Sequence, residues 1–522
     1  MGEKTFKFFQ IFFLMCISCI TFYVYMSSHK LYSKDEKRMQ YIYLKNEYVN
    51  APKTLITASD NRFVAENREE IQKLYPNVPF EFLRHKNVSG KESCQTFPKR
   101  EPNIYKNKNF TSIFGITFSN QYWQVYTSKY FTLYLYNAYL DRRERKEFGR
   151  RSAIRIIVFG TKYISVMNQH RWETNRCLIW YDNSEDPKVS DVLIEKTPMG
   201  DGMGKYRAYL LTCHIPHSLG RRIPHAVSII EQGSSRDICQ EPSNYLKVIY
   251  NHGAKKDVAV CMKGLSIVEE NWSNRFIEWI ELLSNLGADK IFFYELGVHP
   301  DIKKVLNYYV EKGIVDLTKV TLPGNQPNEM LNQHNYLKGR LLQQRPNSML
   351  HLNDCLYRNI NRYKFLAYID IDEVIVPRDP DHTWIDLLRI LSDEYNDADY
   401  FKIRSTYFFE DISKYPSLSN TSANGTSNFM YMLRKLYRSK AHLKGKSFIR
   451  TKYVKTVNCH IARECLNRRC KFQDVDVEAA HVHHYRKSCQ RMVEDDTCLR
   501  YKQNLVFDNT LLKFQEKLYS KM

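Results

Sequence analysis

The stretch from Phe365 to Pro377, with the sequence FLAYIDIDEVIVP, constrains the fold more than any other part of the chain. Its first five residues carry no charge, which is typical of a strand that is buried on both faces. Asp370 and Asp372 follow two positions apart, so on an extended backbone both carboxylates point to the same side. Pro377 cannot donate a ladder hydrogen bond, which indicates that the strand has ended by that residue. We therefore expect a buried strand whose carboxyl end presents two acids.

Two carboxylates on one side of a strand repel each other unless a positive charge lies between them. A hard divalent cation such as Mg²⁺ or Mn²⁺ supplies that charge and also binds the phosphates of a substrate. Acids that merely end a strand are the simpler interpretation of an isolated D-x-D motif. The apolar strand before this pair favours the cation site.

Length and composition allow a large folded protein. The chain has 522 residues, of which 43% are hydrophobic, so it is long enough for two domains with a substantial core. An aromatic content of 14% argues against disorder. The formal net charge of +21 attracts anions such as nucleic acid, acidic lipid or a phosphorylated small molecule, and charge alone does not choose among these.

Residues 8–26 contain no charged side chain, and about 20 such residues span a bilayer as a helix. No small-x-small cleavage site follows this run, which favours a signal anchor over a cleaved signal peptide. Residues 1–7 are then a cytosolic tail. The flanking lysines mildly favour the opposite orientation, because Lys4 and Lys7 precede the run and four basic residues follow it.

Acceptor sites and cysteines indicate that the rest of the chain is luminal. The N-x-[ST] pattern occurs five times, at Asn87, Asn109, Asn271, Asn420 and Asn424. Of the 13 cysteines, eleven lie beyond the anchor, and in an oxidising compartment they would form disulfides with one left over. The cysteines between residues 459 and 498 contain no C-x₂-C pair, so a zinc site there is the weaker alternative.

The pattern of the chain changes twice after the anchor. Residues 27–110 are polar, are interrupted by prolines, and are predicted to form a stem. Residues 111–250 contain short β-like runs and are predicted to be a β-rich accessory module. Residues 251–510 alternate strands with helices, such as those that end near Gly287 and begin at Pro300. This alternation predicts an α/β domain with a mainly parallel sheet, whose ligands bind at the carboxyl ends of the strands.

Two further motifs can contribute to a site. In the run AHVHHYR that ends at Arg486, a strand places His483 on one face and His484 on the other. One of these imidazoles can complete a metal site, and Arg486 can pair with a phosphate. Asp354, on a predicted helix, can bind a ribose or orient a metal ligand, although an ordinary acid on the helix surface is the simpler interpretation.

Several blocks together resemble glycosyltransferase family 92. They include Val258–Lys263, Asn353–Cys355, Ile369–Glu373 and His484–Arg486, and the upstream segment Tyr136–Arg142 is similar to a Y-x-A-Y-x-D-x-R pattern. The resemblance covers roughly residues 130–500. It implies a GT-A fold in a single-pass type II Golgi membrane enzyme that transfers galactose from UDP-galactose to a glycan. It also implies inversion at the sugar and the use of Mn²⁺ or Mg²⁺.

The resemblance assigns roles by position. Asp370 and Asp372, with His484 as a distal ligand, would hold the metal. The residues that would contact the UDP-sugar are Lys263, Asp354, Asp370, Asp372 and Arg486. A separate carboxylate must act as general base, and the candidates are Glu410 and Asp411, which follow the strand-like run 400–409. These two acids could also simply open a polar loop.

Two other functions fit parts of the sequence. In a haloacid-dehalogenase-like phosphatase, Asp370 would be the nucleophile and Asp372 the acid/base, but no later G-D-x-x-x-D pair is present. A membrane-anchored carbohydrate-binding protein would use the aromatic-rich middle region to stack on sugars of a glycoprotein or glycolipid. Nucleic-acid binding has only the net charge in its favour and conflicts with the anchor and the acceptor sites.

Overall fold

The computed structural model describes most of the chain beyond residue 122. The described ranges are 123–128, 130–143, 152–161, 175–181, 187–190, 194–199, 205–231, 242–379, 381–409, 433–435, 445–466, 468–486, 505–508 and 510–511. All of them belong to one compact unit, Arg68–Met522. The expected tail, anchor and stem lie outside these ranges. No helix within them is long and apolar enough to cross a membrane.

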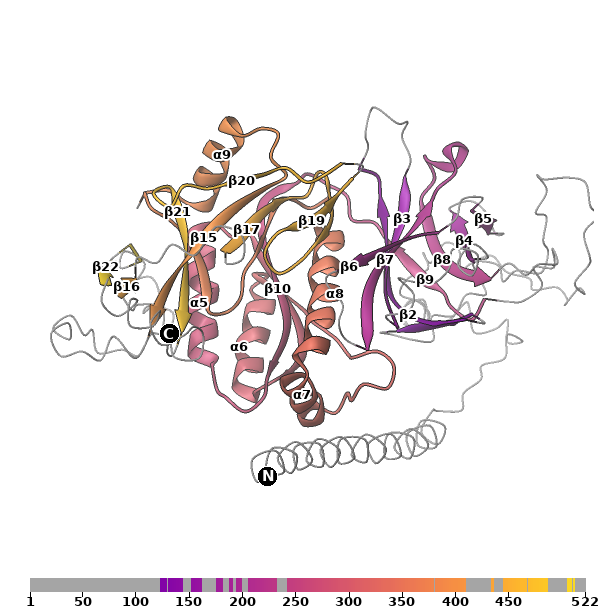
Figure 1. Ribbon diagram of the computed structural model, residues 1–522, viewed down its shortest axis with the longest axis horizontal. Coiled ribbons are helices and arrows are strands. Elements are labelled where there is room, and N and C mark those ends of the chain that lie inside the picture. Colours follow the sequence, from indigo (N-terminus) through magenta and orange to yellow (C-terminus); the bar gives the residue numbers. More distant parts are fainter. Residues whose placement is uncertain are drawn as a thin grey trace, which may run out of the picture. The chain divides into compact units, whose positions relative to one another are not determined.

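The first sheet is built from strands between residues 124 and 249 (Figure 1). Its strands are β1 (Gln124–Thr127), β2 (Thr132–Asp141), β3 (Ala153–Thr161), β4 (Asn175–Tyr181), β5 (Lys188–Val189), β6 (Glu195–Met199), β7 (Tyr206–His214), β8 (Pro224–Glu231) and β9 (Leu246–Ile249). They are ordered β5-β4-β8-β9-β2-β3-β7-β6, with β1 on β2, and a short 3₁₀ helix (His217–Leu219) follows β7.

This sheet folds over onto itself. One apolar cluster combines Ile179 of β4 and Val227 of β8 with Leu135 of β2 and Ile156 of β3, although β9 lies between these two pairs of strands in the sheet order. The disulfide between Cys177 of β4 and Cys213 of β7 crosses the same core. The accessory module therefore has its own hydrophobic interior.

The second sheet is built mainly from strands after residue 255. Its strands are β10 (Lys256–Ile267), β11 (Lys290–Val298), β12 (Val315–Lys319), β13 (Tyr363–Tyr368), β14 (Glu373–Pro377), β15 (Tyr400–Phe409), β17 (Gly445–Arg450), β20 (Phe472–Asp474) and β21 (Ala480–Arg486). Two small sheets lie beside it, formed by β16 (Leu433–Lys435) with β22 (Leu505–Phe507) and by β18 (Val454–Val457) with β19 (Ala462–Cys465).

The order of the second sheet is β12-β11-β10-β13-β17-β15-β21-β14, with β20 on β15. Neighbouring strands from β12 to β13 are parallel, as the alternation of strands and helices predicts. β17 runs antiparallel to both of its neighbours, and β14 runs antiparallel to β21. The sheet is therefore mixed rather than purely parallel.

Helices cover both faces of this sheet. They are α5 (Ser273–Leu286), α6 (Pro300–Glu311), α7 (Met330–Gly339), α8 (Leu341–Asn359) and α9 (Trp384–Glu394). α5 ends at Gly287, whose φ of 108° is in the left-handed region that glycine favours. α6 has Pro300 at its start, and Asp301 lies in its positively polarised first turn. The predicted end of α5 and the predicted start of α6 are thus confirmed.

The two faces of the second sheet have different partners. On one face, Trp279 of α5, Leu306 of α6 and Leu388 of α9 pack in a single apolar cluster with the strands. On the other face, Leu352 of α8 packs with Phe159 of the first sheet in a second cluster. Figure 1 shows α8 between β10 and strands β6 and β7. The two sheets thus share a hydrophobic layer that is centred on α8.

Residues 365–377 do not form one continuous strand, which corrects the sequence prediction. β13 ends at Tyr368 in the middle of the sheet, the chain turns through Asp370 and Asp372, and β14 then pairs with β21 at the sheet edge. β14 also continues through Pro377, which is paired with Ala480. A proline is tolerated there because β14 has only one neighbour in the sheet path.

Candidate active site

The acid pair lies in the turn that connects β13 to β14, and contacts from distant parts of the chain fix this turn. The backbone N–H of Glu373 donates to the Asp370 carbonyl at 3.0 Å, and the N–H of Tyr485 in β21 donates to the Asp372 carbonyl at 2.8 Å. The indole N–H of Trp279, in α5, donates to the Glu373 carbonyl at 2.8 Å. Carboxylate oxygens of Asp370, Asp372 and Glu373 lie within 4.8 Å of one another.

Two lysines compensate Asp370. Lys446 of β17 contacts Asp370 Oδ2 at 3.0 Å and Glu373 Oε2 at 2.8 Å, and its side chain is only 3% exposed. Lys263 of β10 contacts Asp370 Oδ1 at 3.1 Å and is 40% exposed. Burial alone would raise the pKa of Asp370, but the charges of Lys446 and Lys263 outweigh it and hold that pKa well below its usual range. Asp370 is therefore an ionised anchor for two ammonium groups.

Asp372 faces the carboxyl end of β21. Its Oδ2 lies 3.4 Å from His484 Nε2 and 3.7 Å from the Arg486 guanidinium. Burial raises the pKa of Asp372, and the hydrogen bond and charge of His484, with Arg486, outweigh it, so the pKa is lowered overall. Arg486 remains 40% exposed, as Lys263 does. The acid turn thus lies between two cations that solvent can reach.

The structure resolves which histidine of the AHVHHYR run faces the acids. β21 puts His484 beside Asp372 and Glu373, whereas His483 points to the other side of the strand, toward His481. A one-residue shift in register would exchange these faces. The register is fixed, because Glu373 pairs with His484 across the β14–β21 ladder.

The donor atoms at Asp372 and His484 fit a divalent cation. His484 Nε2 is buried and faces Oδ2 of the Asp372 carboxylate at 3.4 Å. A carboxylate oxygen and a neutral imidazole nitrogen suit Mn²⁺ and similar ions. Both oxygens of Asp370 already face ammonium groups. Asp372 and His484 are therefore the pair best placed to hold a metal, with Asp370 adjacent.

The structure does not bring Asp354 to this site. This residue is fully buried in α8, where it accepts hydrogen bonds from Tyr294 (2.8 Å), Asn137 (2.8 Å), Arg358 (2.6 Å) and the Tyr139 hydroxyl. Tyr139 and Asn137 belong to β2 of the first sheet. Asp354 therefore joins the two sheets, so neither a ribose contact nor an exposed helix surface describes it.

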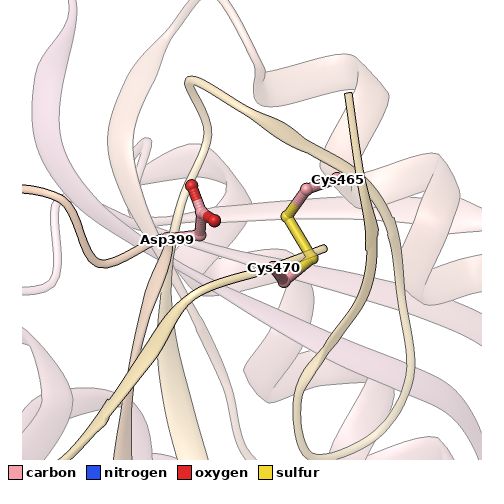
Figure 2. A group of neighbouring side chains, drawn as sticks. All are labelled: Asp399, Cys465 and Cys470. Carbon is pink, nitrogen blue, oxygen red and sulfur yellow. A yellow bond between two sulfur atoms is a disulfide. The ribbon is translucent and has the colours of Figure 1, made fainter. Parts of the chain in front are cut away.

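The cysteine-rich segment after residue 458 contains a disulfide. Figure 2 shows Cys465 and Cys470 bonded to each other beside Asp399, so their sulfurs are not available as thiolate ligands. Asp399 instead accepts a hydrogen bond from the Lys471 backbone N–H at 2.8 Å and pairs with Arg468. Within the described residues, Cys261 and Cys355 form another disulfide, and Cys459 is in none.

Two residues of this charge cluster were not predicted from the sequence, and two predicted residues lie outside the described part of the chain. Sequence reasoning did not assign roles to Glu373 and Lys446, which complete the charge cluster at the turn. Glu373 directly follows the D-x-D motif, so its position was the available signal. Nothing local to Lys446 indicates that it faces residues near 370. The general-base candidates Glu410 and Asp411 lie outside the described residues.

Comparison with known proteins identifies the family to which the chain belongs. No curated protein matches the chain. Residues 256–521, which include the second sheet, the acid turn and the β21 histidines, match the family model of Glycosyltransferase family 92. The match covers just over half of the 522 residues. The chain belongs to glycosyltransferase family 92.

Proposed function

We propose that this protein transfers galactose from UDP-galactose to a glycan on a glycoprotein or glycolipid, with inversion and with Mn²⁺ or Mg²⁺ bound. Family membership supports glycosyl transfer from a nucleotide-sugar donor. The choice of galactose, of UDP and of inversion follows from the sequence resemblance. The observation that carries the proposal is the convergence of Asp372 with the buried ring nitrogen Nε2 of His484, between the cations Lys263 and Arg486.

The residues at the turn have complementary roles in this proposal. Asp372 and His484 hold the cation, which when bound acts as a Lewis acid on the departing diphosphate. Arg486 provides a planar guanidinium that can bind phosphate oxygens in a bidentate manner. Lys263 is held at the acid turn by Asp370, with its ammonium group still partly exposed to a phosphate. These contacts stabilise negative charge that develops on the leaving group.

Inversion also requires a base on the opposite side of the sugar. Glu410 and Asp411 remain the candidates, because they directly follow β15, which pairs with β21 beside His484. A carboxylate there would accept the proton of the acceptor hydroxyl as the bond to the sugar forms. Replacing each acid separately by its amide, Glu410→Gln and Asp411→Asn, identifies the base through the loss of turnover without loss of UDP binding.

The wider setting is part of the same proposal. A mixed sheet with its polar turn at the carboxyl end of a central parallel strand is compatible with a GT-A catalytic domain. Residues 8–26 would anchor the chain in the Golgi membrane as a type II protein, with the catalytic part in the lumen. Immunofluorescence of the tagged chain, with protease protection to locate the tag, tests that placement.

Activity of the purified full-length chain tests the chemistry. We expect release of UDP from UDP-galactose in the presence of Mn²⁺ and a glycan acceptor, and loss of that release after chelation of the metal. Other nucleotide sugars in the same assay identify the donor. Glycan binding with no release of any nucleoside diphosphate would favour the carbohydrate-binding alternative instead. Phosphate release from phosphomonoesters would favour the phosphatase.

Asp372→Ala should reduce transfer by at least about 100-fold, because even the outer partners of metal ligands are worth about 10–100-fold. Asp379→Asn, which changes an exposed acid away from the turn, is the control and should keep full activity. Both variants should be produced in the same amount as the unchanged chain. Full activity of the Asp372 variant would remove the acid turn from the mechanism.

A further inference from the structure

The face of β21 that points away from the acid turn carries a second cluster of ligand-type side chains. His481 and His483 lie on this face, and Asp508, which follows β22, approaches them. All three are buried, with exposed fractions of 2%, 1% and 7%. One imidazole nitrogen from each histidine and one carboxylate oxygen lie within 4.8 Å of one another. None of these residues belongs to the site described above.

The two imidazoles are held in a fixed orientation. Their rings are parallel within 8°, with centroids 4.7 Å apart, and the ring of His483 also stacks on Phe408. The Nε2 atoms of His481 and His483 face each other at 2.8 Å. His483 Nδ1 lies 3.3 Å from the Tyr485 hydroxyl on the outer side. A partner on the outer nitrogen is the usual arrangement of a histidine that binds metal through its other nitrogen.

The carboxylate of Asp508 closes the third side. Its Oδ1 accepts the backbone N–H of Thr510 at 3.0 Å, while its Oδ2 lies 3.8 Å from His481 Nε2 and 3.6 Å from the Arg378 guanidinium. Asp508 therefore presents a buried carboxylate oxygen to the two histidines.

These distances are close to those of a tetrahedral metal site. Bonds of about 2.0–2.1 Å to zinc place tetrahedral ligand atoms about 3.3 Å from one another. The observed separations of 2.8 Å and 3.8 Å lie on either side of that value, so small side-chain rotations suffice. Two imidazoles and one carboxylate favour zinc and its neighbours over Mg²⁺, which prefers oxygen ligands.

We propose that His481, His483 and Asp508 form a second metal site, separate from the acid turn, which takes Zn²⁺ or a similar transition-metal ion. The ion fastens the segment that follows β22 to β21. Since His484 is the next residue after His483, the same ion also stiffens the strand that positions His484 beside Asp372. The site has a structural role and does not depend on which sugar the enzyme transfers.

Zinc content of the full-length chain tests the proposal. The protein is stripped with a chelator, incubated with Zn²⁺, dialysed, and analysed by mass spectrometry of the metal. We expect about one tightly held zinc ion per chain, as in a structural site. Asp508→Asn and His481→Gln should each weaken zinc binding at least about tenfold. His484→Gln, on the opposite face of the same strand, and His382→Gln, a partly exposed histidine elsewhere, should keep the zinc.

Two further measurements keep the result interpretable if a variant folds poorly. Co²⁺ bound to the unchanged chain, with water as the fourth ligand beside the three side chains, should give the intense visible bands of four-coordinate geometry, and this measurement requires no variant. Zn²⁺ should raise the Tm of the unchanged chain and of the His484 variant, but not that of Asp508→Asn. The proposal is overturned if the unchanged chain retains no zinc. It is also overturned if Asp508→Asn binds zinc as tightly as the unchanged chain, or if His484→Gln is the variant that loses it.

Discussion

At the scale of single residues, Lys446 is the unexpected feature of the candidate active site. An acid pair at the end of a strand suggests a cation that comes from solution, yet one of its acids is already neutralised by a buried lysine. That lysine also contacts Glu373, so the three carboxylates of the turn can lie close together. Much of the positive charge that balances the carboxylates of the turn thus comes from a lysine side chain of the protein itself.

Lys446→Met should lower the free energy of unfolding by about 3–5 kcal/mol, because it removes the buried cation that pairs with both Asp370 and Glu373. Chemical denaturation of the full-length chain measures this loss. Lys263→Met makes the same chemical change at a side chain that is 40% exposed, and it should cost at most about 1 kcal/mol. Equal losses of stability in the two variants would contradict the conclusion that the buried charge of Lys446 contributes more than the partly exposed charge of Lys263.

The effect of Lys446→Met should not change between pH 5.5 and pH 7.5. Burial lowers the pKa of Lys446, but Asp370 and Glu373 outweigh burial and raise it, so its stabilising charge is present throughout that range and is lost only at strongly alkaline pH. The pKa of Asp370 is depressed, so its contribution is present above the ordinary aspartate pKa of about 3.9 and is lost only in acid. Denaturation at both pH values checks this expectation, and a difference above about 1 kcal/mol would show that one of the groups titrates.

At the scale of elements, the turn between β13 and β14 shows where local sequence reasoning succeeds and where it fails. α5 and α6 were predictable because Gly287 and Pro300 mark their ends locally. The turn at Asp370 contains neither glycine nor proline, and its geometry is imposed by Trp279 and Tyr485, which are distant in the sequence.

The residues of the candidate site likewise divide into those that the local sequence predicts and those that depend on distant strands. The faces of β21 follow from its period of two, so the sequence separates His483 from His484 but cannot say which of them faces the acids. That choice depends on the pairing of β21 with β14. Lys446 could not be found at all, because β17 reaches Asp370 only through long-range strand pairing.

Gly445→Ala should destabilise the protein by about 1–3 kcal/mol through a clash that cannot be relieved by a side chain. A Cβ at this first residue of β17 would lie 2.5 Å from the backbone carbonyl oxygen of Ile403 in β15. Thermal unfolding measures the loss. Gly339→Ala is the control, since its Cβ would meet nothing within 4 Å, and it should be neutral or stabilising. A neutral result at Gly445 would mean that β15 and β17 can separate at no cost.

At the scale of the whole molecule, the two sheets are joined by polar as well as apolar contacts. Asp354 of α8 accepts hydrogen bonds from Tyr139 of the first sheet and from Tyr294 of the second. Burial raises the pKa of both tyrosines, with the charge of Asp354 acting in the same direction, so they remain neutral donors. The disulfide from Cys261 to Cys355 ties α8 to β10 beside this network.

Asp354→Asn should cost about 3–5 kcal/mol of stability, because it removes the negative charge that pairs with Arg358 and places an amide among hydroxyl and amide donors. It should also increase proteolytic cleavage between the sheets, near residues 250–256. Limited proteolysis with thermal unfolding checks both effects. Asp301→Asn, an exposed acid, should show neither effect. Unchanged proteolysis and stability in the Asp354 variant would contradict a joining role.

The contacts of Asp370 also connect catalytic competence with the completion of folding. Its two lysines come from β10 and β17, the strands on either side of β13, so a late-synthesised strand must insert before the acids are neutralised. Before β17 pairs, Glu373 lacks its lysine and Asp370 has Lys263 alone, so repulsion among the three carboxylates opposes closure of the turn. A nascent molecule should therefore remain unable to consume its donor, and enzymatic competence should appear together with resistance to unfolding rather than ahead of it.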